Sequence, residues 1–170
     1  RRLLTHAVAL TALAYAYRSL RTFEGWRRVP SVRERRAAAP AVSIVVPARD
    51  EERNIERCVR SLMAQAYVEH EVIVVDDRST DGTGAILEAL MSEFPALRVV
   101  DGEPLPDGWV GKPWACAQGA RQARYPWLLF TDADSVHEPH AAASTLAFAR
   151  EAGADALTIM TGQELVTLAE

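Results

Sequence analysis

The chain has 170 residues, of which 49% are apolar and 25% charged, as is usual for a globular domain, and this excludes collagen-like or intrinsically disordered chains. Its two cysteines, Cys58 and Cys116, lack the paired spacing of a zinc site or the density of a disulfide scaffold, so we expect reduced thiols. The net charge of -4 is uneven, because residues 1–40 hold nine arginines and two glutamates, about +7, and the rest holds about -11.

Residues 1–40 combine an apolar stretch with a basic flank. The stretch from Leu3 to Tyr17 is apolar and compatible with a helix, but its roughly fifteen residues fall short of the twenty or so that span a bilayer. Seven arginines follow it, as is typical of the cytoplasmic flank of a membrane helix. We predict a membrane-proximal helix and a basic linker here. The alternatives are a signal-peptide remnant or a helix packed on the next domain.

From residue 41 to residue 170, short apolar runs alternate with segments of helical spacing. Strands are predicted over residues 43–46, 71–75, 97–100, 127–130 and 156–160. Helices are predicted from Glu51, after Gly82, from Pro113 to about Arg124, and from Pro139 to Gly153. Asp50 and Glu51 are expected to cap the first of these helices. The alternation predicts one α/β domain over 41–170 with a mostly parallel sheet between helices.

Acidic clusters directly follow three of the predicted strands. Residues 47–51 follow the first strand, residues 76–79 the second, and residues 132–134 the fourth. Ligands of such sheets bind beyond the carboxyl ends of the strands, so the clusters should meet at one edge. Because crowded carboxylates repel one another unless a cation or a polar ligand holds them, we predict a hard divalent metal, Mg2+ or Mn2+, and a polar ligand there.

Asp132 and Asp134 offer two oxygen donors two residues apart, which could join a metal to the phosphates of a substrate. Such triplets are also common in turns and helix caps, and the placement after a buried strand favours the metal. His137 could add a ligand or be a solvated loop histidine.

Asp76 and Asp77 are adjacent, so in an extended chain their side chains point to opposite faces. We expect Asp77 to contact the ligand and Asp76 to hold the loop, while Asp81 caps the next helix. Two neighbouring arginines, Arg49 and Arg78, could pair with these carboxylates or with phosphate.

Lys112 is the only lysine beside eighteen arginines. A compact ammonium after a glycine-rich turn predicts a contact with a diphosphate, and the alternative is a chance surface lysine. Trp109 and Trp114 could shape a sugar or acceptor site, although core packing is an equal alternative for Trp114.

Together and in this order, these motifs resemble the family 2 glycosyltransferases over about residues 42–165. The segments that carry the resemblance are 43–52, 74–83, 111–115 and 131–135. It implies a GT-A α/β fold and an inverting, metal-dependent transfer of a hexose from a nucleotide diphosphate sugar, a UDP-sugar by expectation. Residues 106–112 also resemble the bacterial subgroup that acts on hopanoid or carotenoid-type lipids. This implies a lipid or polyprenoid acceptor at the cytoplasmic face of the inner membrane, and no nucleic-acid partner.

The resemblance also implies individual roles. The implied donor-binding residues are Pro47, Ala48, Asp50, Glu51, Asp76, Asp77, Lys112 and Asp132, and the implied metal ligands are Asp132 and Asp134. The loop 47–51 and Asp77 would hold the nucleobase, Lys112 the phosphates, and the Asp pair the metal and the donor diphosphate.

No catalytic base is assigned. Members of the family use a carboxylate, usually in a Glu-Asp pair well after the metal motif, and no such pair follows Asp134. A later Gln-x-x-Arg-Trp-like segment is absent as well, so we expect a fragment, or a partner that supplies the rest. One alternative is a non-enzymatic module that binds nucleotide sugars. Another is a sugar-phosphate nucleotidyltransferase, which would normally carry a glycine-rich loop after its first strand. The absence of Gly-x-Gly-x-x-Gly argues against a nicotinamide enzyme.

Overall fold

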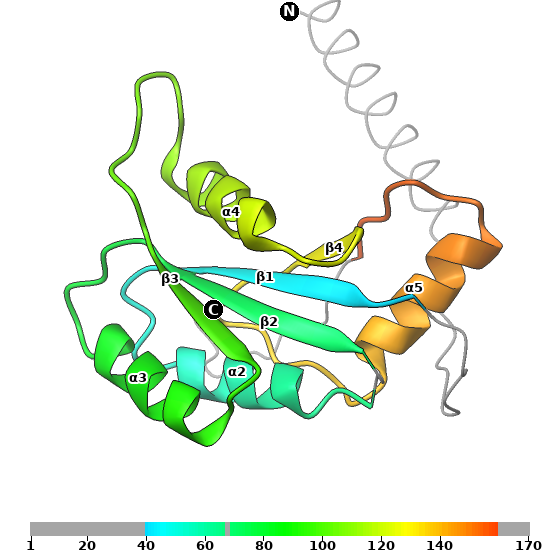
Figure 1. The fold of residues 1–170 in the computed structure, drawn as a ribbon, viewed down its shortest axis with the longest axis horizontal. Helices are drawn as coiled ribbons and strands as arrows, with labels where there is room; N and C mark the ends of the chain where they lie inside the picture. The colour runs from blue at the N-terminus through cyan, green and yellow to red at the C-terminus, as the bar shows by residue number, and fades with distance from the viewer. Residues whose placement is uncertain (1–39, 67–68, 160–170) are drawn as a thin grey trace, which may run out of the picture. The chain divides into compact units, whose positions relative to one another are not determined.

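The computed structural model describes residues 40–66 and 69–159, in which strands and helices alternate (Figure 1). The strands are β1 (Val42–Ala48), β2 (His70–Asp76), β3 (Leu97–Asp101) and β4 (Trp127–Phe130). The helices are α2 (Ile55–Met63), α3 (Thr83–Glu93), α4 (Gly111–Gln122) and α5 (Ala141–Glu151). The predicted α/β alternation is therefore confirmed. The predicted membrane-proximal segment lies outside the described residues, and within them no helix is long and apolar enough to cross a bilayer.

The four strands form one parallel sheet in the order β3-β2-β1-β4. Five consecutive residues are buried in each of the central strands β1 and β2, and most are valine or isoleucine. Near-continuous apolar runs of this kind are typical of parallel strands that helices cover on both faces. The predicted parallel sheet is confirmed.

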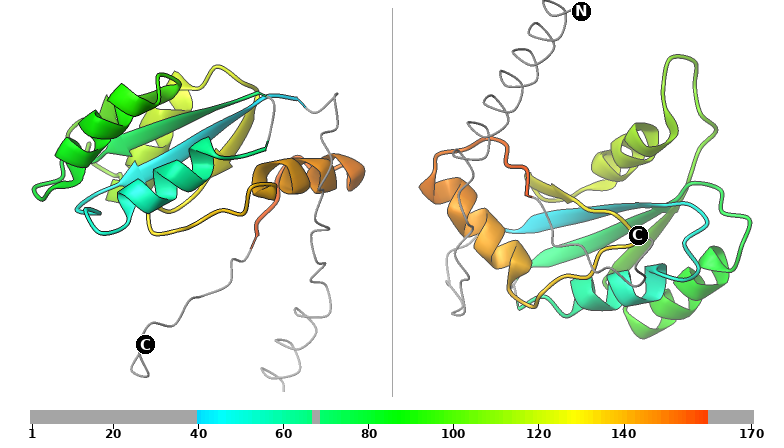
Figure 2. Two further views of the ribbon diagram at one scale, coloured as in Figure 1. Left: turned by 90° about the horizontal axis from the view of Figure 1, so that it is seen from below. Right: turned by 180° about the vertical axis from the view of Figure 1, so that it is seen from behind.

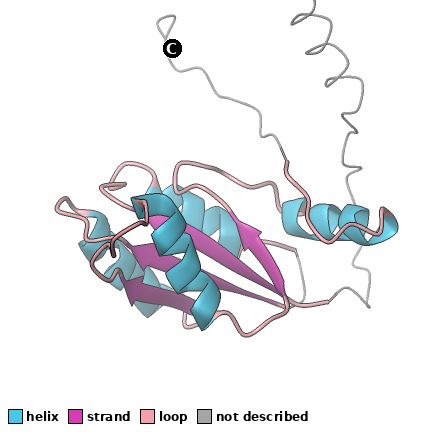
Figure 3. Cartoon of the chain, turned by 90° about the horizontal axis from the view of Figure 1, so that it is seen from above, coloured by secondary structure: helices cyan, strands magenta, loops and turns pink. Residues whose placement is uncertain are grey.

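Helices α2 and α3 cover one face of the sheet and α4 lies on the other (Figures 1 and 2). Ile44 and Val46 of β1 pack in the core beneath α2 and α3, together with Leu87 of α3. On the opposite face, Gly119 brings α4 so close to the sheet that an added Cβ would collide with the side chain of Val45. Figure 3 shows α4 lying across this face.

The start of α2 differs from the prediction. The helix begins at Ile55 rather than near Glu51, and Asn54 at its N-cap makes no side-chain capping bond. Asp50 does not cap it, because its carboxylate accepts the backbone N–H of Thr80 at 2.7 Å instead. The bond across to the next loop outcompetes a local cap.

The end of the described chain also differs from the prediction. Helix α5 ends before Gly153, whose positive φ of 61° suits the residue after a helix, as predicted. Residues 156–159 were predicted to form a strand but are irregular, and Met160 lies outside the described residues. An alternating apolar segment forms a strand only where a neighbouring strand pairs with it, and none in the described chain pairs with 156–159.

Candidate functional site

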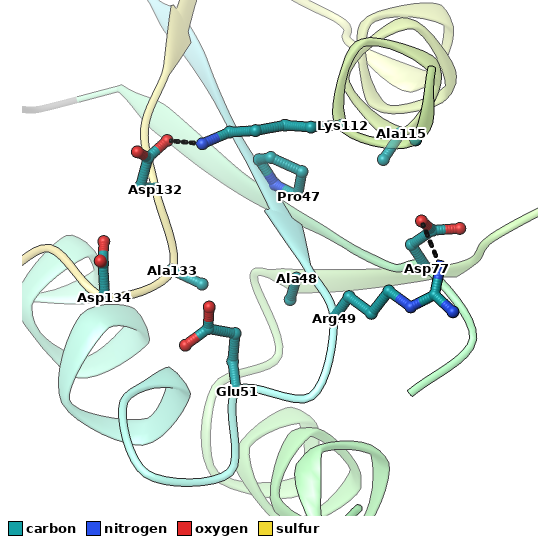
Figure 4. A pocket seen from close by; sticks show the side chains of 11 residues that line it. Pro47, Ala48, Arg49, Glu51, Asp77, Lys112, Ala115, Asp132, Ala133 and Asp134 are labelled. Carbon is teal, nitrogen blue, oxygen red and sulfur yellow. Dashed lines mark ion pairs between the residues drawn. The ribbon is translucent and has the colours of Figure 1, made fainter. Parts of the chain in front are cut away.

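A pocket of about 270 Å³ opens at the carboxyl ends of the strands (Figure 4). Its walls come from the loops after β1, β2 and β4 and from the start of α4. The residues that line it are Pro47, Ala48, Arg49, Glu51, Asp77, Gly111, Lys112, Ala115, Asp132, Ala133 and Asp134. The convergence of three acidic strand ends on one edge, expected from the sequence, is what the structure shows.

The strand register opens this pocket. β4 ends at Phe130, which pairs with Val45, whereas β1 continues to Ala48. Pro47 and Ala48 therefore extend past the end of β4 and border the pocket. The chain after β4 turns away to present residues 132–134 across the gap.

Asp77 occupies one end of the pocket and is the most buried of its carboxylates. The residue is only 6% exposed, and its backbone N–H is donated to the carbonyl oxygen of Ala48 at 2.8 Å. Arg49 Nη1 lies 3.8 Å and Arg78 Nε lies 3.6 Å from its carboxylate oxygens. In this structure both arginines thus pair with a carboxylate, which was one of the two alternatives left open by the sequence.

Asp50 and Asp76 lie outside the pocket lining, and both hold loops. Asp76 Oδ1 accepts the backbone N–H of Ser79 at 2.9 Å, which agrees with the expected division of labour between Asp76 and Asp77. Asp50 has a positive φ of 54°, and its carboxylate binds Thr80 across the gap between the two loops. No contact with a ligand in this pocket is assigned to either residue.

Asp81 braces the start of α3, as predicted. Its Oδ1 accepts the backbone N–H of Thr83 at 2.9 Å and the hydroxyl of Thr83 at 2.6 Å, and its Oδ2 accepts the N–H of Glu52 at 3.1 Å. The loops after β1 and β2 thus hold each other in place, and the residues they present to the pocket are fixed by hydrogen bonds.

Carboxylates dominate the other end of the pocket. Asp132 pairs with Lys112, whose Nζ lies 2.6 Å from Asp132 Oδ1, and both side chains are more than half exposed. Figure 4 shows Glu51 and Asp134 facing the space beside this pair. Glu51 accepts a hydrogen bond from the side chain of Asn54 at 3.0 Å. Within residues 40–66 and 69–159, the carboxylate of Asp134 has no hydrogen-bond or ion-pair partner.

The donor atoms here fit a hard divalent cation in part. Carboxylate oxygens are the ligands that Mg2+ and Mn2+ prefer, and the Lys112 ammonium shows that a cation fits against Asp132. Among the described residues, however, no group of three or more His, Cys, Asp or Glu side chains could hold a metal. Asp132 and Asp134 could therefore hold Mg2+ or Mn2+ only if water or a bound phosphate completed the coordination.

Cys58 of α2 is buried next to this end of the pocket. Its thiol is 1% exposed and points to the carbonyl oxygen of Asp132 at 3.6 Å. Burial first, and then the negative charges of Asp134, Glu51 and Asp132, raise the pKa of Cys58 to about 12. Three carboxylates of the pocket thus lie close enough to Cys58 to act on its thiol. Cys58 and Cys116 are both free thiols, as predicted.

The aromatic residues and His137 do not line this pocket. Trp114 is 6% exposed and packs in the interior, and Trp109 is 43% exposed and meets it edge-on with ring centroids 5.1 Å apart. His137 lies against Thr131, with Nε2 2.9 Å from Oγ1, and burial lowers its pKa. It is neither positioned as a metal ligand in this pocket nor the fully solvated histidine of the alternative prediction.

Sequence reasoning did not single out three of the small residues in the lining, Gly111, Ala115 and Ala133. Gly111 and Ala115 lie one turn apart on α4, and Ala133 is 3% exposed between the two aspartates. Small side chains carry no chemical signal in a sequence, and the helix was predicted from Pro113, so the i, i+4 spacing of Gly111 and Ala115 on one helix face was not recognised.

The sequence of the chain is similar to those of known glycosyltransferases. The model of "Glycosyl transferase family 2" matches residues 43–162. The probable glycosyltransferase YdaM of Bacillus subtilis is 31% identical over 124 residues, which cover 72% of this chain and 29% of YdaM. The 4,4'-diaponeurosporenoate glycosyltransferase of Staphylococcus aureus is 38% identical over 95 residues, which cover 55% of this chain and 24% of that protein. The chain thus spans less than a third of these relatives.

Two solved structures share the fold. Staphylococcus aureus TarS 1-349 in complex with UDP-GlcNAc has a TM-score of 0.54 and 32% identity, covering 65% of this chain and 31% of that one. The mannosyltransferase PcManGT of Pyrobaculum calidifontis, in complex with GDP-Man and Mn2+, has a TM-score of 0.60 and 28% identity, covering 81% and 41%.

Proposed function

The chain belongs to glycosyl transferase family 2, and on this premise we propose that its pocket binds the nucleotide diphosphate sugar from which a glycosyltransferase takes a hexose. The observation that carries the proposal is the polarity of the pocket, with a buried carboxylate, Asp77, at one end and exposed carboxylates beside Lys112 at the other. A nucleotide sugar has a base with hydrogen-bond donors for the Asp77 end, and an anionic diphosphate that Lys112 and a divalent cation on the exposed carboxylates would bind. The GT-A fold supports the same reading.

In the proposed complex the nucleobase lies near Asp77. Asp77 is held by its backbone bond to Ala48 and by two arginines, so its carboxylate is a fixed acceptor for a base N–H. Pro47 and Ala48 form the adjoining wall, and Glu51 lies farther along the pocket, toward Asp134 (Figure 4). A UDP-sugar is the first choice of donor, since one structural relative was solved with UDP-GlcNAc, and GDP-sugars are the competing choice because another was solved with GDP-Man.

The diphosphate lies at the other end, between β4 and α4. Asp132 and Asp134 would hold Mg2+ or Mn2+, which would offset the charge that develops on the departing nucleoside diphosphate. Lys112 supplies a second cation from the first turn of α4, where the helix dipole and free backbone N–H groups also favour an anion. These residues would bind and orient the leaving group.

We propose further that transfer inverts the anomeric centre and that the acceptor is a lipid or polyprenoid at the cytoplasmic face of the inner membrane. The carotenoid-related relative and the basic flank of residues 1–40 support this acceptor class. No residue is assigned as the base that takes the acceptor's proton.

Calorimetric titration of UDP and of GDP into the whole chain tests the donor site, with Mn2+ and with chelator. We expect metal-dependent binding of one nucleotide, weakened at least about tenfold in Asp134→Asn, since the removed charge would act directly on the metal. Asp107→Asn is the matched control, because Asp107 is an exposed aspartate of the β3–α4 loop outside the pocket lining. A folded chain that binds neither nucleotide would contradict the proposal.

A further inference from the structure

The ion pair between Lys112 and Asp132 sets two proposed roles against each other. Lys112 Nζ lies 2.6 Å from Asp132 Oδ1, and the dashed line in Figure 4 shows it bridging from α4 to the loop after β4. In the proposed function Asp132 is a metal ligand and Lys112 a phosphate contact. In the structure, the ammonium instead contacts a carboxylate oxygen that the metal would need.

We propose that Lys112 is an internal counter-cation that competes with the divalent metal for Asp132 and moves to the diphosphate when the donor binds. This inference rests on the proposed function and adds a coupling to it. The metal alone must displace Lys112, whereas a bound diphosphate gives the ammonium a new partner. Donor and metal should therefore each strengthen the binding of the other.

The exposure of the pair makes the exchange feasible. The Lys112 side chain is 59% exposed and that of Asp132 57%. An ion pair as exposed as this contributes little to stability, so a divalent cation or a diphosphate can break it. A lysine also suits exchange, because its ammonium is a point charge on a flexible stem, whereas a guanidinium would fix a bidentate geometry.

The carboxylates around the Lys112–Asp132 pair explain why a divalent cation can still bind there. Asp134 is unpaired within the described residues, Glu51 pairs only with the neutral side chain of Asn54, and both face the space beside Asp132 (Figure 4). A metal is thus attracted to this end of the pocket, but pays the cost of displacing or approaching the Lys112 ammonium.

The test compares Mn2+ affinity, measured by calorimetry without nucleotide, in the wild-type chain, Lys112→Gln and Arg49→Gln. Arg49 is the matched control, because its removal takes one positive charge from the same pocket but from Asp77 rather than from Asp132. We expect Mn2+ to bind Lys112→Gln about fivefold more tightly than wild type, and Arg49→Gln less than about twofold more tightly. Circular dichroism verifies that each variant is folded.

A second titration measures the coupling. In the wild-type chain, saturating UDP or GDP should tighten Mn2+ binding, because the diphosphate draws the Lys112 ammonium away from Asp132. In Lys112→Gln no ammonium competes with the metal, so this gain in Mn2+ affinity should be about fivefold smaller. The proposed competition would be overturned by equal Mn2+ affinities in all three proteins, or by equal tightening of Mn2+ binding in the wild type and Lys112→Gln. Either result would leave the donor site intact. Folded wild-type and Lys112→Gln chains that both fail to bind Mn2+ would overturn the inference together with the proposed metal site.

Discussion

The two ends of the same parallel strands carry charge in opposite ways. At the amino ends, Glu71 of β2 is 1% exposed and satisfied by hydrogen bonds from three residues. Ser43 Oγ donates to it at 2.6 Å, the backbone N–H and Nε of Arg124 donate at 2.7 and 2.9 Å, and Arg98 Nη1 donates at 3.3 Å. We call these four residues the amino-end cluster. It ties β1, β2, β3 and the segment before β4 together.

At the carboxyl ends the carboxylates are incompletely paired, and Asp132 and Asp134 are exposed whereas Asp77 is buried. Asp132 has one lysine, Asp77 has two arginines at 3.6 and 3.8 Å, and Asp134 has no partner among the described residues. A buried charge destabilises the fold unless it is fully hydrogen-bonded, whereas an exposed charge without a partner is solvated by water and destabilises the fold little. Charge at the amino ends of the strands therefore stabilises the fold, and charge at the carboxyl ends is available for binding.

The largest expected effect is the loss of stability on removing the charge of the amino-end cluster. Glu71→Gln replaces charge-assisted hydrogen bonds from two arginines with weaker neutral ones, and we expect the free energy of unfolding in urea to fall by about 2 to 3 kcal/mol. Glu69→Gln is the matched control at an exposed glutamate near the same strand end, expected to change it by less than about 0.5 kcal/mol. Equal effects of the two substitutions would remove the distinction between the strand ends.

A change at the α4–sheet contact should affect both ends. The added Cβ of Gly119→Ala would collide with Val45 Cγ1 and lie 3.1 Å from Val75 Cγ2, so the helix must shift. We expect a loss of about 1 to 3 kcal/mol in the urea experiment, as for other overpacked cores. Because Lys112 lies on the same helix, nucleotide affinity should fall too. Gly108→Ala tests the positive φ of 81° in the preceding loop, where no atom lies within 4 Å of the new Cβ. A Gly119→Ala chain of wild-type stability would show that α4 is less tightly packed than described.

Acid should weaken the amino-end cluster in a predictable range of pH. Burial alone raises the pKa of Glu71, but the hydrogen bonds from Ser43 and Arg124 and the charge of Arg124 together hold it below the ordinary value of 4.5. The folded state therefore binds this proton less readily than the unfolded state. The stabilisation is fully present above about pH 5.5 and is lost as the pH falls through 4.5 and then through the folded-state pKa.

The measurement is the difference in unfolding free energy between wild type and Glu71→Gln at a series of pH values. We expect the difference to be constant between pH 6 and 7 and to shrink steadily below about pH 4.5, because glutamine cannot titrate. Other carboxylates titrate in both proteins and largely cancel. A difference that stays constant down to pH 3 would mean that the charge of Glu71 contributes nothing.

The local pattern of the sequence was sufficient for most of the fold. Strand and helix periodicity predicted the order of elements and the parallel sheet, and the rule that ligands bind at the carboxyl ends predicted that Asp77, Asp132 and Asp134 meet at one edge. These features depend on spacing along the chain, which a sequence displays directly.

What the sequence did not show depends on partners distant along the chain. Glu71 looked like an ordinary strand residue, because the residues that bind it lie 27 to 53 positions away. Asp50 looked like a helix cap, but its partner is Thr80 in the next loop. The pairing of Lys112 with Asp132 was likewise unforeseen. In each case a local motif admitted several partners, and tertiary structure selected one.

The smallest expected effect on stability is at Asp134, and it distinguishes most clearly between the charges at the two ends of the strands. Asp134→Asn removes a charge that no described residue pairs with and that faces the same space as Glu51, beside Asp132 (Figure 4). We therefore expect the free energy of unfolding to stay within about 0.5 kcal/mol of wild type, or to rise slightly, in the urea experiment without metal. The same substitution should weaken metal-dependent nucleotide binding at least about tenfold. Weaker binding with unchanged stability would show that Asp134 serves the ligand and not the fold. A large loss of stability in metal-free buffer would instead show that Asp134 is a structural charge, like Glu71.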